Sequence, residues 1–233
     1  PYFPKYYGSF TTVDTKAGYI IMQYIDAMDL EYVMHDLACI SEFESYKKCL
    51  TESMGFIAAE LATAIQILHD NNIVHGDIKP ENIIITKDGH AMLIDFGHSI
   101  KLKSLKTQMK GIIGTYKYVA PEVDLSTKFN LIYFDYQIDW YSYGVTLSHF
   151  DKCYLKAKET FYLKRKDILP DILNRVGPQK YSLIESCTEF APSARVKSLE
   201  ELKTLEVFQG INWDEMKQRK AQPPGNSLNL FTF

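Results

Sequence analysis

The stretch that decides the fold is the run His75-Gly76-Asp77-Ile78-Lys79-Pro80-Glu81-Asn82, followed further along by the tripeptide Asp95-Phe96-Gly97. Asp77 is suited to accept or orient the proton of a substrate hydroxyl, and Lys79 can offset negative charge that develops on a phosphate. Asn82 and Asp95 offer an amide oxygen and a carboxylate, and oxygen atoms are the ligands that Mg²⁺ prefers. The two motifs together predict a site that holds a metal-bound nucleotide and passes a phosphoryl group to a hydroxyl.

Taken alone, Asp95-Phe96-Gly97 is a weak signal, because tripeptides recur by chance and an aspartate often merely caps a turn. The order of the motifs carries more weight, since each of the two follows a short apolar run that predicts a strand. Further landmarks follow in order: Gly114-Thr115, Ala120-Pro121-Glu122, Asp139-Trp140-Tyr141-Ser142-Tyr143-Gly144 and Arg195. Chance does not account for so many motifs in this order.

This ordered set resembles the eukaryotic protein kinases, whose catalytic loop reads H-R-D-x-K-x-x-N and whose metal loop reads D-F-G. The resemblance covers nearly the whole chain and implies a kinase-like α+β fold. It implies ATP and Mg²⁺ as cofactors, a protein or peptide substrate, Asp77 and Lys79 as catalytic residues, and Asn82 and Asp95 as metal ligands. The lysine two positions after Asp77 resembles the Ser/Thr class of these kinases.

The resemblance also assigns residues to the nucleotide side of the pocket. These are Met22 as the gatekeeper, Gln23, Tyr24 and Ile25 in the hinge, Asp29 near the ribose, Ile84 beneath the adenine ring, and Glu81, which could also pair with a basic residue upstream of the target Ser or Thr. Two structural sets are implied as well: a regulatory spine of Tyr6, His75 and Phe96 anchored by Asp139, and a buried ion pair between Glu122 and Arg195. For Tyr6 and Met22, plain core packing is the alternative.

The composition is that of a soluble globular protein, with 233 residues, of which 46% are hydrophobic and 24% charged. A formal net charge of -3 argues against a nucleic-acid partner, which would require a basic face. No apolar run is long enough to cross a bilayer, so we expect no membrane partner, and the oligomeric state stays open. The four cysteines form no metal-binding pattern, which favours free thiols in a reducing, intracellular compartment, either cytoplasm or nucleus.

The hydrophobic pattern predicts a small β part followed by a mostly helical body. Expected strands cover 3–10 and 18–25, as a hairpin, and then Ile73-Val74, 82–85 and 91–94; expected helices cover 29–37, 51–69 and 136–150, with more from Tyr154 onward. Residues 101–114 are expected to form a loop, and the tail from Lys217 an extended segment. We therefore expect 1–25 to be the end of a kinase small lobe, 26–210 the large lobe and 211–233 a C-terminal tail.

The segment from Phe208 to Arg219 resembles the end of an AGC-group kinase domain, where its tail begins. His149 lies where arginine-directed members of that group carry a glutamate, so a preference for arginine near the target hydroxyl is not expected. Gly76 replaces the arginine of H-R-D, and Gly111 stands where AGC relatives carry a phosphorylated threonine. The threonine that would accept the phosphate and the arginine that would bind it are both missing, so we expect no activating phosphorylation at this site.

The largest departure from the family is at the front of the chain. We find no glycine-rich loop over the phosphates and no strand lysine that pairs with a helix glutamate. We therefore expect a fragment of a Ser/Thr kinase, with doubtful activity on its own. The alternative is a pseudokinase or a lobe-only regulatory module that binds another kinase, although the four intact chemistry-bearing residues favour the enzyme. A small-molecule kinase of related fold is disfavoured by the complete activation segment from Gly97 to Glu122, which serves peptide docking.

Overall fold

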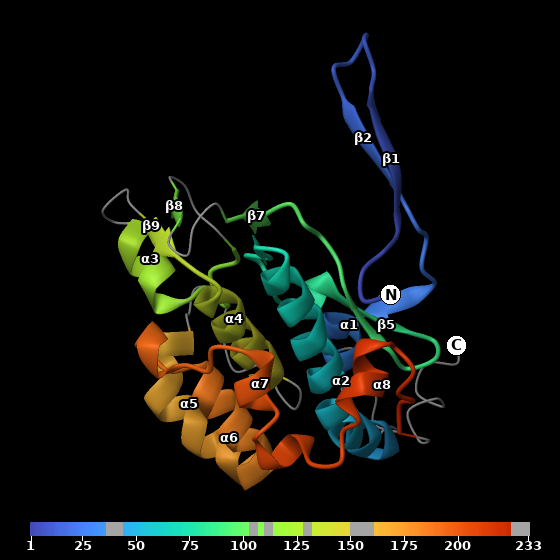
Figure 1. Ribbon diagram of the computed structural model, residues 1–233. Coiled ribbons are helices and arrows are strands. Elements are labelled where there is room, and N and C mark those ends of the chain that lie inside the picture. The colour runs from blue at the N-terminus through green and yellow to red at the C-terminus, as the bar shows by residue number, and fades with distance from the viewer. Residues whose placement is uncertain (36–43, 103–106, 110–113, 128–131, 150–160, 225–233) are drawn as a thin grey trace.

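The computed structural model describes residues 1–35, 44–102, 107–109, 114–127, 132–149 and 161–224, and it shows a mainly helical body with small sheets and one projecting hairpin (Figure 1). The helices are α1 (Leu30–His35), α2 (Glu44–Asp70), α3 (Pro121–Thr127), α4 (Gln137–Ser148), α5 (Phe161–Val176), α6 (Pro178–Cys187), α7 (Leu199–Leu202) and α8 (Trp213–Lys217). The strands are β1 (Tyr6–Thr11), β2 (Gly18–Met22), β3 (Ala27–Asp29), β4 (Ile73–Val74), β5 (Ile83–Thr86), β6 (Ala91–Leu93), β7 (Ile100–Lys101), β8 (Thr107–Met109) and β9 (Ile132–Phe134). Short 3₁₀ turns are η1 (Pro80–Asn82), η2 (Pro192–Ala194) and η3 (Glu206–Phe208). The predicted α+β class is confirmed.

Helices α2 and α4 form the centre of the body, and α6 packs against α4 (Figure 1). Along α2, the buried residues Met54, Ile57 and Leu61 recur every three or four positions and so share one face. Nearly every residue of α4 is buried, because α2 and α6 both cover it. A Cβ atom at Gly144 would lie 2.5 Å from the Cβ of Cys187, so the glycine allows α4 and α6 to approach closely.

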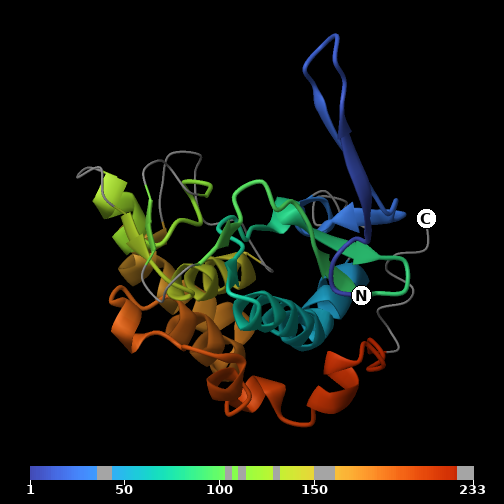
Figure 2. The same cartoon turned by 45° about the horizontal axis from the view of Figure 1, so that its top comes forward.

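Small antiparallel sheets bring the sequence motifs together. One sheet has the order β3-β5-β6, and β4 pairs separately with β7. The run from His75 to Asn82 follows β4 and leads into β5, while Asp95 comes shortly after β6. The backbone N–H of Ile94 donates to the carbonyl of Asn82 over 2.9 Å, which joins the ends of the two loops. Figure 2, with the top of the molecule turned forward, shows these strands beside α2.

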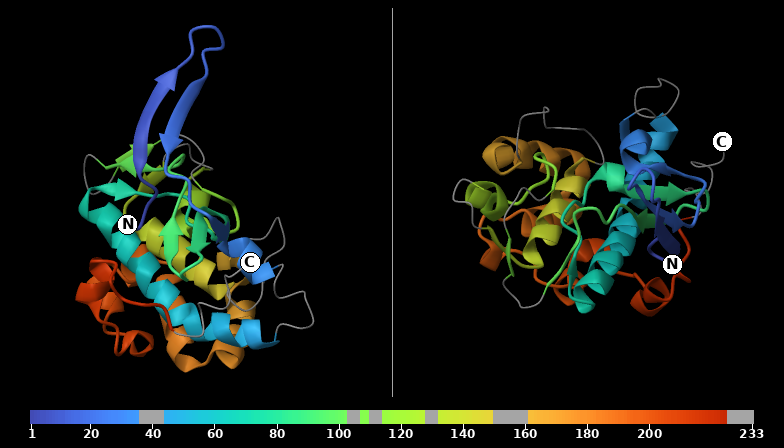
Figure 3. Two further views of the ribbon diagram at one scale, coloured as in Figure 1. Left: turned by 90° about the vertical axis from the view of Figure 1, so that its right-hand side faces the viewer. Right: turned by 90° about the horizontal axis from the view of Figure 1, so that it is seen from above.

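Strands β1 and β2 form the predicted hairpin, which projects away from the body (Figure 3). The strands are shorter than expected: the first begins at Tyr6 rather than Phe3, and the second ends at Met22 rather than Ile25. The large apolar side chains that its two strands expose are Tyr6, Tyr7, Phe10, Tyr19, Ile20, Ile21 and Met22. An isolated two-stranded hairpin is only marginally stable in water, so these side chains form a surface suited to further packing.

Other predicted boundaries are corrected by long-range contacts. The long helix begins at Glu44 rather than Thr51. Asp29, expected to open a helix, ends β3 and caps α1, since its Oδ1 accepts the N–H of Tyr32 over 2.7 Å. The expected loop 101–114 contains β8, which pairs with β9. Strands of three residues depend on their partners, so a local pattern does not reveal them.

Two expectations extend beyond the described residues. The predicted helix 136–150 is observed as α4, which ends at Ser148, while Phe150 lies outside the described part of the chain. The predicted helix 29–37 is observed as α1, which ends at His35, and Leu37 likewise lies outside the described part of the chain. The expected tail has no helix or strand from 218 to 224, and the rest of it also lies outside that part.

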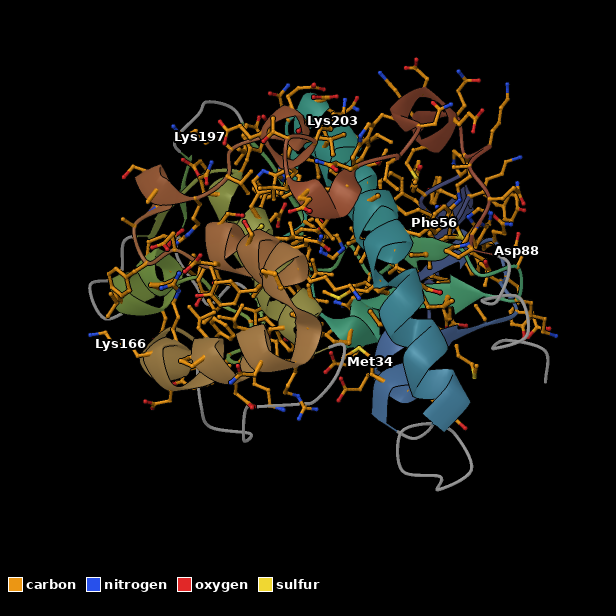
Figure 4. The ribbon with its side chains drawn as sticks, turned by 90° about the horizontal axis from the view of Figure 1, so that it is seen from below. Met34, Phe56, Asp88, Lys166, Lys197 and Lys203 are labelled. Atoms are coloured by element: carbon orange, nitrogen blue, oxygen red, sulfur yellow. The ribbon has the colours of Figure 1, made fainter. Side chains whose placement is uncertain are left out.

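A charged cluster ties both ends of the described chain to α2. The carboxylate of Glu60, which is only 1% exposed, accepts a hydrogen bond from His90 over 2.7 Å and lies 3.1 Å from Arg219. The guanidinium of Arg219 lies 4.6 Å from the centre of the Tyr2 ring. Figure 4 labels Phe56 on α2, whose ring lies 5.8 Å from that of His90. The cluster therefore holds the segment before β1, the β5–β6 turn and the segment after α8 on one helix.

Candidate functional site

Asp139 on α4 holds the start of the catalytic loop through its buried carboxylate. Its Oδ2 accepts the backbone N–H of His75 and is hydrogen-bonded to His69 Nε2, each over 2.8 Å, while Oδ1 accepts the N–H of Gly76 over 2.9 Å. Burial raises the pKa of Asp139, but His69 and the backbone donors outweigh it, so the net pKa lies below the usual value. Asp139 thus holds the backbone of His75, one of the three residues of the spine that it was expected to anchor.

Asp77 lies at the centre of a hydrogen-bonded network. The ammonium of Lys79 is 2.9 Å from Asp77 Oδ2, and the hydroxyl of Thr115 donates to Asp77 Oδ1 over 2.8 Å. Lys79 also donates to the oxygen of Thr115 over 2.8 Å, which closes a triangle of three side chains. Asn82 donates its amide N–H to Asp77 Oδ2 over 3.1 Å. The structure thus brings the predicted site residues Asp77, Lys79 and Asn82 together in one hydrogen-bonded group.

The network sets the charge of Asp77. Burial raises its pKa, because desolvation disfavours a carboxylate. The hydrogen bonds from Lys79 and Thr115 outweigh that effect and hold the net pKa below the usual value. Asp77 is therefore ionised at neutral pH and acts as an acceptor, which suits it to orient a substrate hydroxyl.

Two glycines allow the activation segment to approach the catalytic loop. Gly76 has a φ of 80° and Gly114 a φ of 83°, in the left-handed region that glycine adopts at little cost. A Cβ atom at Gly114 would lie 2.7 Å from the carbonyl oxygen of Gly76. A side chain at Gly114 would therefore displace the neighbouring Thr115 from Asp77.

The residues expected to hold Mg²⁺ have suitable donor atoms. The side-chain N–H₂ of Asn82 is used on Asp77, which leaves the amide oxygen as its ligand atom. Asp95 is exposed, and its Oδ1 accepts the N–H of Gly97 over 3.0 Å, which leaves Oδ2 for a cation. Among the described residues, no group of three His, Cys, Asp or Glu side chains is arranged so that it could hold a metal ion. An amide oxygen and one carboxylate, together with phosphate oxygens, fit Mg²⁺ chemistry.

Phe96 lies against His75 as expected, but the third expected member of the spine is wrong. The rings of Phe96 and His75 are 5.2 Å apart and tilted by 60°, and Phe3 meets Phe96 edge to face at 5.6 Å. Tyr6 is 60% exposed and donates its hydroxyl to Ser9 instead. The physical reason is that β1 starts at Tyr6 and leaves the body, so the residue that reaches Phe96 comes three positions earlier.

The residues expected on the adenine side lie at the end of β2 and in the connection to β3. The side chain of Met22 is 54% exposed and that of Tyr24 is 87% exposed. The backbone N–H of Gln23 donates to the carbonyl of Lys5 over 2.7 Å, and Ile25 is partly buried. Nucleotide binding by these four residues stays a prediction.

Asp29 and Ile84 are brought side by side, because they are partners in the β3–β5 register. Asp29 caps α1 through one carboxylate oxygen, so the other is available to a ligand. Glu81 is exposed in η1, within the catalytic loop. Its predicted contact with nucleotide or with substrate stays a prediction.

A small hollow of about 10 Å³ lies beside Asp77. Its polar edge includes Asp77 and Thr115, and its apolar wall includes Tyr118, Val119, Val123 and Ile138. A hollow of this size holds about one water molecule.

The predicted pair of Glu122 and Arg195 is confirmed. Both nitrogens NH1 and NH2 of Arg195 contact the carboxylate oxygens of Glu122, each over 2.6 Å. Arg195 is 2% exposed and lies over the ring of Tyr141 at 4.7 Å. The pair fixes the start of α3, at the end of the activation segment, to the segment before α7.

Sequence reasoning missed three contacts around the site. Thr115 was recognised only as part of a motif, although it is bound directly to Asp77. Phe3 carried no signal, because it was expected to belong to the first strand. His149 was compared with a substrate-binding glutamate, but it is 1% exposed and hydrogen-bonded to the hydroxyl of Tyr118 over 3.1 Å.

Comparisons with known proteins also find protein kinases. The family model for the protein kinase domain matches residues 2–207. The chain is 26% identical over 214 residues to protein kinase C delta type from Homo sapiens, covering 88% of this chain and 29% of that protein. It is 32% identical over 177 residues to ribosomal protein S6 kinase alpha-1 from Mus musculus, covering 74% of this chain and 23% of that protein. It is 27% identical over 225 residues to the RAC family serine/threonine-protein kinase homolog from Dictyostelium discoideum, covering 93% of this chain and 46% of that protein.

The chain thus spans less than half the length of each of these relatives. Within the described part of the chain, no helix combines the length and apolarity needed to cross a bilayer.

Proposed function

Because this chain belongs to the protein kinase family, we propose that it is an ATP-dependent Ser/Thr protein kinase, which transfers the γ-phosphoryl group to a protein hydroxyl. The observation that carries the proposal is the network of Asp77, Lys79, Thr115 and Asn82. It holds one ionised carboxylate beside one ammonium, at a separation of 2.9 Å.

The chain's own residues have distinct roles in this reaction. Asp77 accepts a hydrogen bond from the substrate hydroxyl and orients its oxygen for in-line attack on phosphorus. The new O–P bond forms as the bond to the diphosphate leaving group breaks, and Asp77 receives the hydroxyl proton. Lys79 stabilises the negative charge of the transferring group. When bound, Mg²⁺ would neutralise phosphate charge, with Asn82 and Asp95 as its protein ligands.

We also propose the division of the chain into 1–25 as the end of a small lobe, 26–210 as the large lobe and 211–233 as a tail. The projecting hairpin supports this division, because it makes few contacts with the body and exposes apolar side chains. Met22, Gln23, Tyr24, Ile25, Asp29 and Ile84 would then contact the nucleoside. Full activity would require cover over the phosphates as well.

A regulatory binding module is the second candidate function. It is favoured by the same hairpin, whose exposed apolar residues are available to a protein partner. In that case the chain would bind another protein, and Asp77 would contribute nothing to its effect.

The two candidates are separated by an assay of phosphoryl transfer from Mg-ATP to Ser- and Thr-containing peptides. We expect the full chain to transfer phosphate, at a low rate, and Asp77→Asn to abolish transfer. Asp88→Asn, in the exposed turn between β5 and β6, is the matched control and should keep the wild-type rate. Transfer that persists in Asp77→Asn, or no transfer with binding of Mg-ATP also absent, would favour the binding module.

A further inference from the structure

A buried ion pair fastens the segment after α8 to the long helix α2. Nitrogen NH1 of Arg219 lies 3.1 Å from Glu60 Oε1, and the two side chains are 10% and 1% exposed. The backbone of Arg219 has a φ of 59°, in the left-handed region that residues other than glycine adopt only at a cost. Because contacts of the arginine side chain must offset that cost, the position of Arg219 is specific.

Arg219 also fixes Tyr2, which comes from the opposite end of the chain. The guanidinium lies 4.6 Å from the centre of the Tyr2 ring, a distance at which a cation is attracted to an aromatic face. Tyr2 is 1% exposed, and its hydroxyl donates to the backbone carbonyl of Met216 in α8. The C-terminal segment therefore holds Tyr2 through two separate contacts.

Tyr2 and its neighbour Phe3 in turn contact the part of the chain that contains the metal loop. The backbone N–H of Leu93, two positions before Asp95, donates to the carbonyl of Tyr2 over 3.0 Å. The ring of Phe3 meets that of Phe96 edge to face at 5.6 Å. Asp95 has a φ of 61°, so its own backbone conformation also depends on support from its neighbours.

A continuous series of contacts thus joins the C-terminal segment to the metal loop. Its members, in order, are Glu60, Arg219, Tyr2, Phe3 and Phe96. The alternative is that this cluster only stabilises the fold. Such a role would need the ion pair alone, whereas the series continues to the residue that directly follows Asp95.

We propose that Arg219 is a positioning residue, which acts through Tyr2 and Phe3 to hold Phe96, and with it the metal loop, in the arrangement that binds a magnesium nucleotide. The proposal rests on the proposed kinase function. Loss of Arg219 lowers the fraction of molecules whose metal loop is in place, and the apparent affinity for Mg-ATP falls with that fraction. The rate at saturating Mg-ATP changes little, because bound ligand favours the competent arrangement.

The test is the dependence of phosphoryl transfer on Mg-ATP concentration, measured with the full chain. In Arg219→Met we expect the KM for Mg-ATP to rise about tenfold and kcat to stay within about twofold of the wild type. Arg219→Lys keeps a charge for Glu60 but loses the planar group over Tyr2, so its KM should rise only about threefold. Tyr2→Phe, which loses only the bond to Met216, should give a similar rise of about threefold, and it serves as the test if Arg219→Met does not fold.

A second measurement reports on the metal loop without any need for phosphoryl transfer. Phe96 is labelled by incorporation of para-fluorophenylalanine at that position, and its fluorine NMR spectrum is recorded with and without Mg-ADP. We expect the resonance to shift or broaden in Arg219→Met and in Phe3→Leu. The double variant should resemble Phe3→Leu in both spectrum and KM, because the two changes interrupt the same series of contacts.

The matched control is Arg165→Met. Arg165 on α5 has a side chain that is 20% exposed, and its NH2 lies 2.6 Å from a carboxylate oxygen of Glu189, so this variant also removes a partly buried arginine ion pair. Its partner follows α6 rather than belonging to α2 or the metal loop. We expect an unchanged KM and an unchanged fluorine spectrum. An equal rise of KM in Arg165→Met would indicate general destabilisation and overturn the proposal.

An unchanged KM and an unchanged spectrum in both Arg219→Met and Phe3→Leu would also overturn it. These results with normal transfer would reject the positioning role alone and leave the proposed kinase function standing. A wild-type chain that neither binds Mg-ATP nor transfers phosphate would reject the kinase function. In that case a changed fluorine spectrum in Arg219→Met would still support the coupling of Arg219 to Phe96, and an unchanged one would reject it.

Discussion

Thr115 donates its hydroxyl hydrogen to Asp77 Oδ1 over 2.8 Å, which joins the activation segment to the catalytic loop across 38 positions of sequence. The bond matters for two reasons. It orients one carboxylate oxygen of Asp77, and it places Thr115 where Lys79 also donates to its oxygen. The reactive geometry therefore depends on the position of the activation segment.

Replacement of Thr115 by valine tests this dependence. The variant keeps the shape of the side chain but removes the donor to Asp77 and the acceptor for Lys79. We expect the rate of phosphoryl transfer to fall by about 10²-fold, since misplacing a reacting group by ~1 Å has an effect of that order. The measurement is steady-state transfer from Mg-ATP to a peptide. Thr63→Val is the control, because Thr63 lies on α2 and its hydroxyl donates to the carbonyl of Ala59, away from Asp77. A similar loss of activity in Thr63→Val would attribute the effect to general destabilisation.

The second prediction concerns the pH dependence of Asp77. Its pKa lies below the usual value because donors from Lys79 and Thr115 outweigh its burial. A carboxylate whose pKa is depressed in the folded state stabilises the fold above its unfolded pKa, and that stabilisation is lost as the pH falls through the folded pKa. Lys79→Met removes the strongest of these donors and should raise the pKa of Asp77. The acid limb of the transfer rate should therefore move to higher pH.

The direct measurement is titration of the ¹³C-labelled carboxyl group of Asp77 by NMR. Lys87→Met, which removes a lysine paired with Asp26 at the surface, is the control and should leave the Asp77 titration unchanged. A titration midpoint that stays the same or falls in Lys79→Met would show that Lys79 does not set this pKa.

Much of this site could be predicted because its residues are contiguous in sequence. The run from His75 to Asn82 and the tripeptide at Asp95 carry their chemistry in short motifs, and the structure brings Asp77, Lys79 and Asn82 together as expected. Fold class followed from the same motifs and from the apolar spacing along α2.

The errors came from contacts that no local pattern encodes. The resemblance to kinases placed Tyr6 beside Phe96, but Tyr6 begins the strand that pairs with β2 and leaves the body. The pairing of β8 with β9 joins segments on either side of α3, and their residues have no strong alternation of their own. His149 was compared by position with a substrate-binding glutamate, whereas it is buried and hydrogen-bonded to the hydroxyl of Tyr118.

The third prediction concerns the stability of the Glu122–Arg195 pair. Arg195 is enclosed by Glu122, by the ring of Tyr141 and by backbone carbonyls that include that of Glu189. Glu122→Ala leaves the guanidinium buried without its carboxylate, which typically costs 3–5 kcal/mol. We expect a free energy of unfolding lower by about that amount in urea denaturation.

The comparison is Glu200→Ala at the exposed end of the Lys203 pair. Exposed ion pairs contribute roughly 0–1 kcal/mol, so this variant should unfold almost as the wild type does. Equal losses in the two variants would mean that the Glu122 pair contributes no more than a surface contact.

The fourth prediction compares two glycines on the central helices, Gly144 on α4 and Gly55 on α2. A Cβ atom at Gly144 would lie 2.5 Å from Cys187 and 2.9 Å from Thr188, so Gly144→Ala must force α4 and α6 apart. Such overpacking costs about 1–3 kcal/mol. At Gly55 on α2 the nearest atom to an added Cβ is the carbonyl oxygen of Val207, at 3.6 Å. Gly55→Ala should therefore stabilise the helix by up to about 1 kcal/mol. The melting temperatures of both variants measure these changes. A melting temperature of Gly144→Ala above that of the wild type would contradict the packing of α4 on α6.

The last prediction concerns activation. Gly76 has no side chain to bind a phosphate, and Gly111, which lies outside the described residues, cannot accept one. The activation segment has a different support, since Thr107 to Met109 pair as a strand with Ile132 to Phe134. We therefore expect that phosphatase treatment leaves the transfer rate within about twofold of the untreated protein, because no guanidinium at position 76 pairs with an added phosphate. Thr107→Ala should behave as the wild type does. Mass spectrometry of the treated and untreated protein verifies the phosphate content, and stoichiometric phosphate on Thr107 that raises the rate would mean that another cation has replaced the missing arginine.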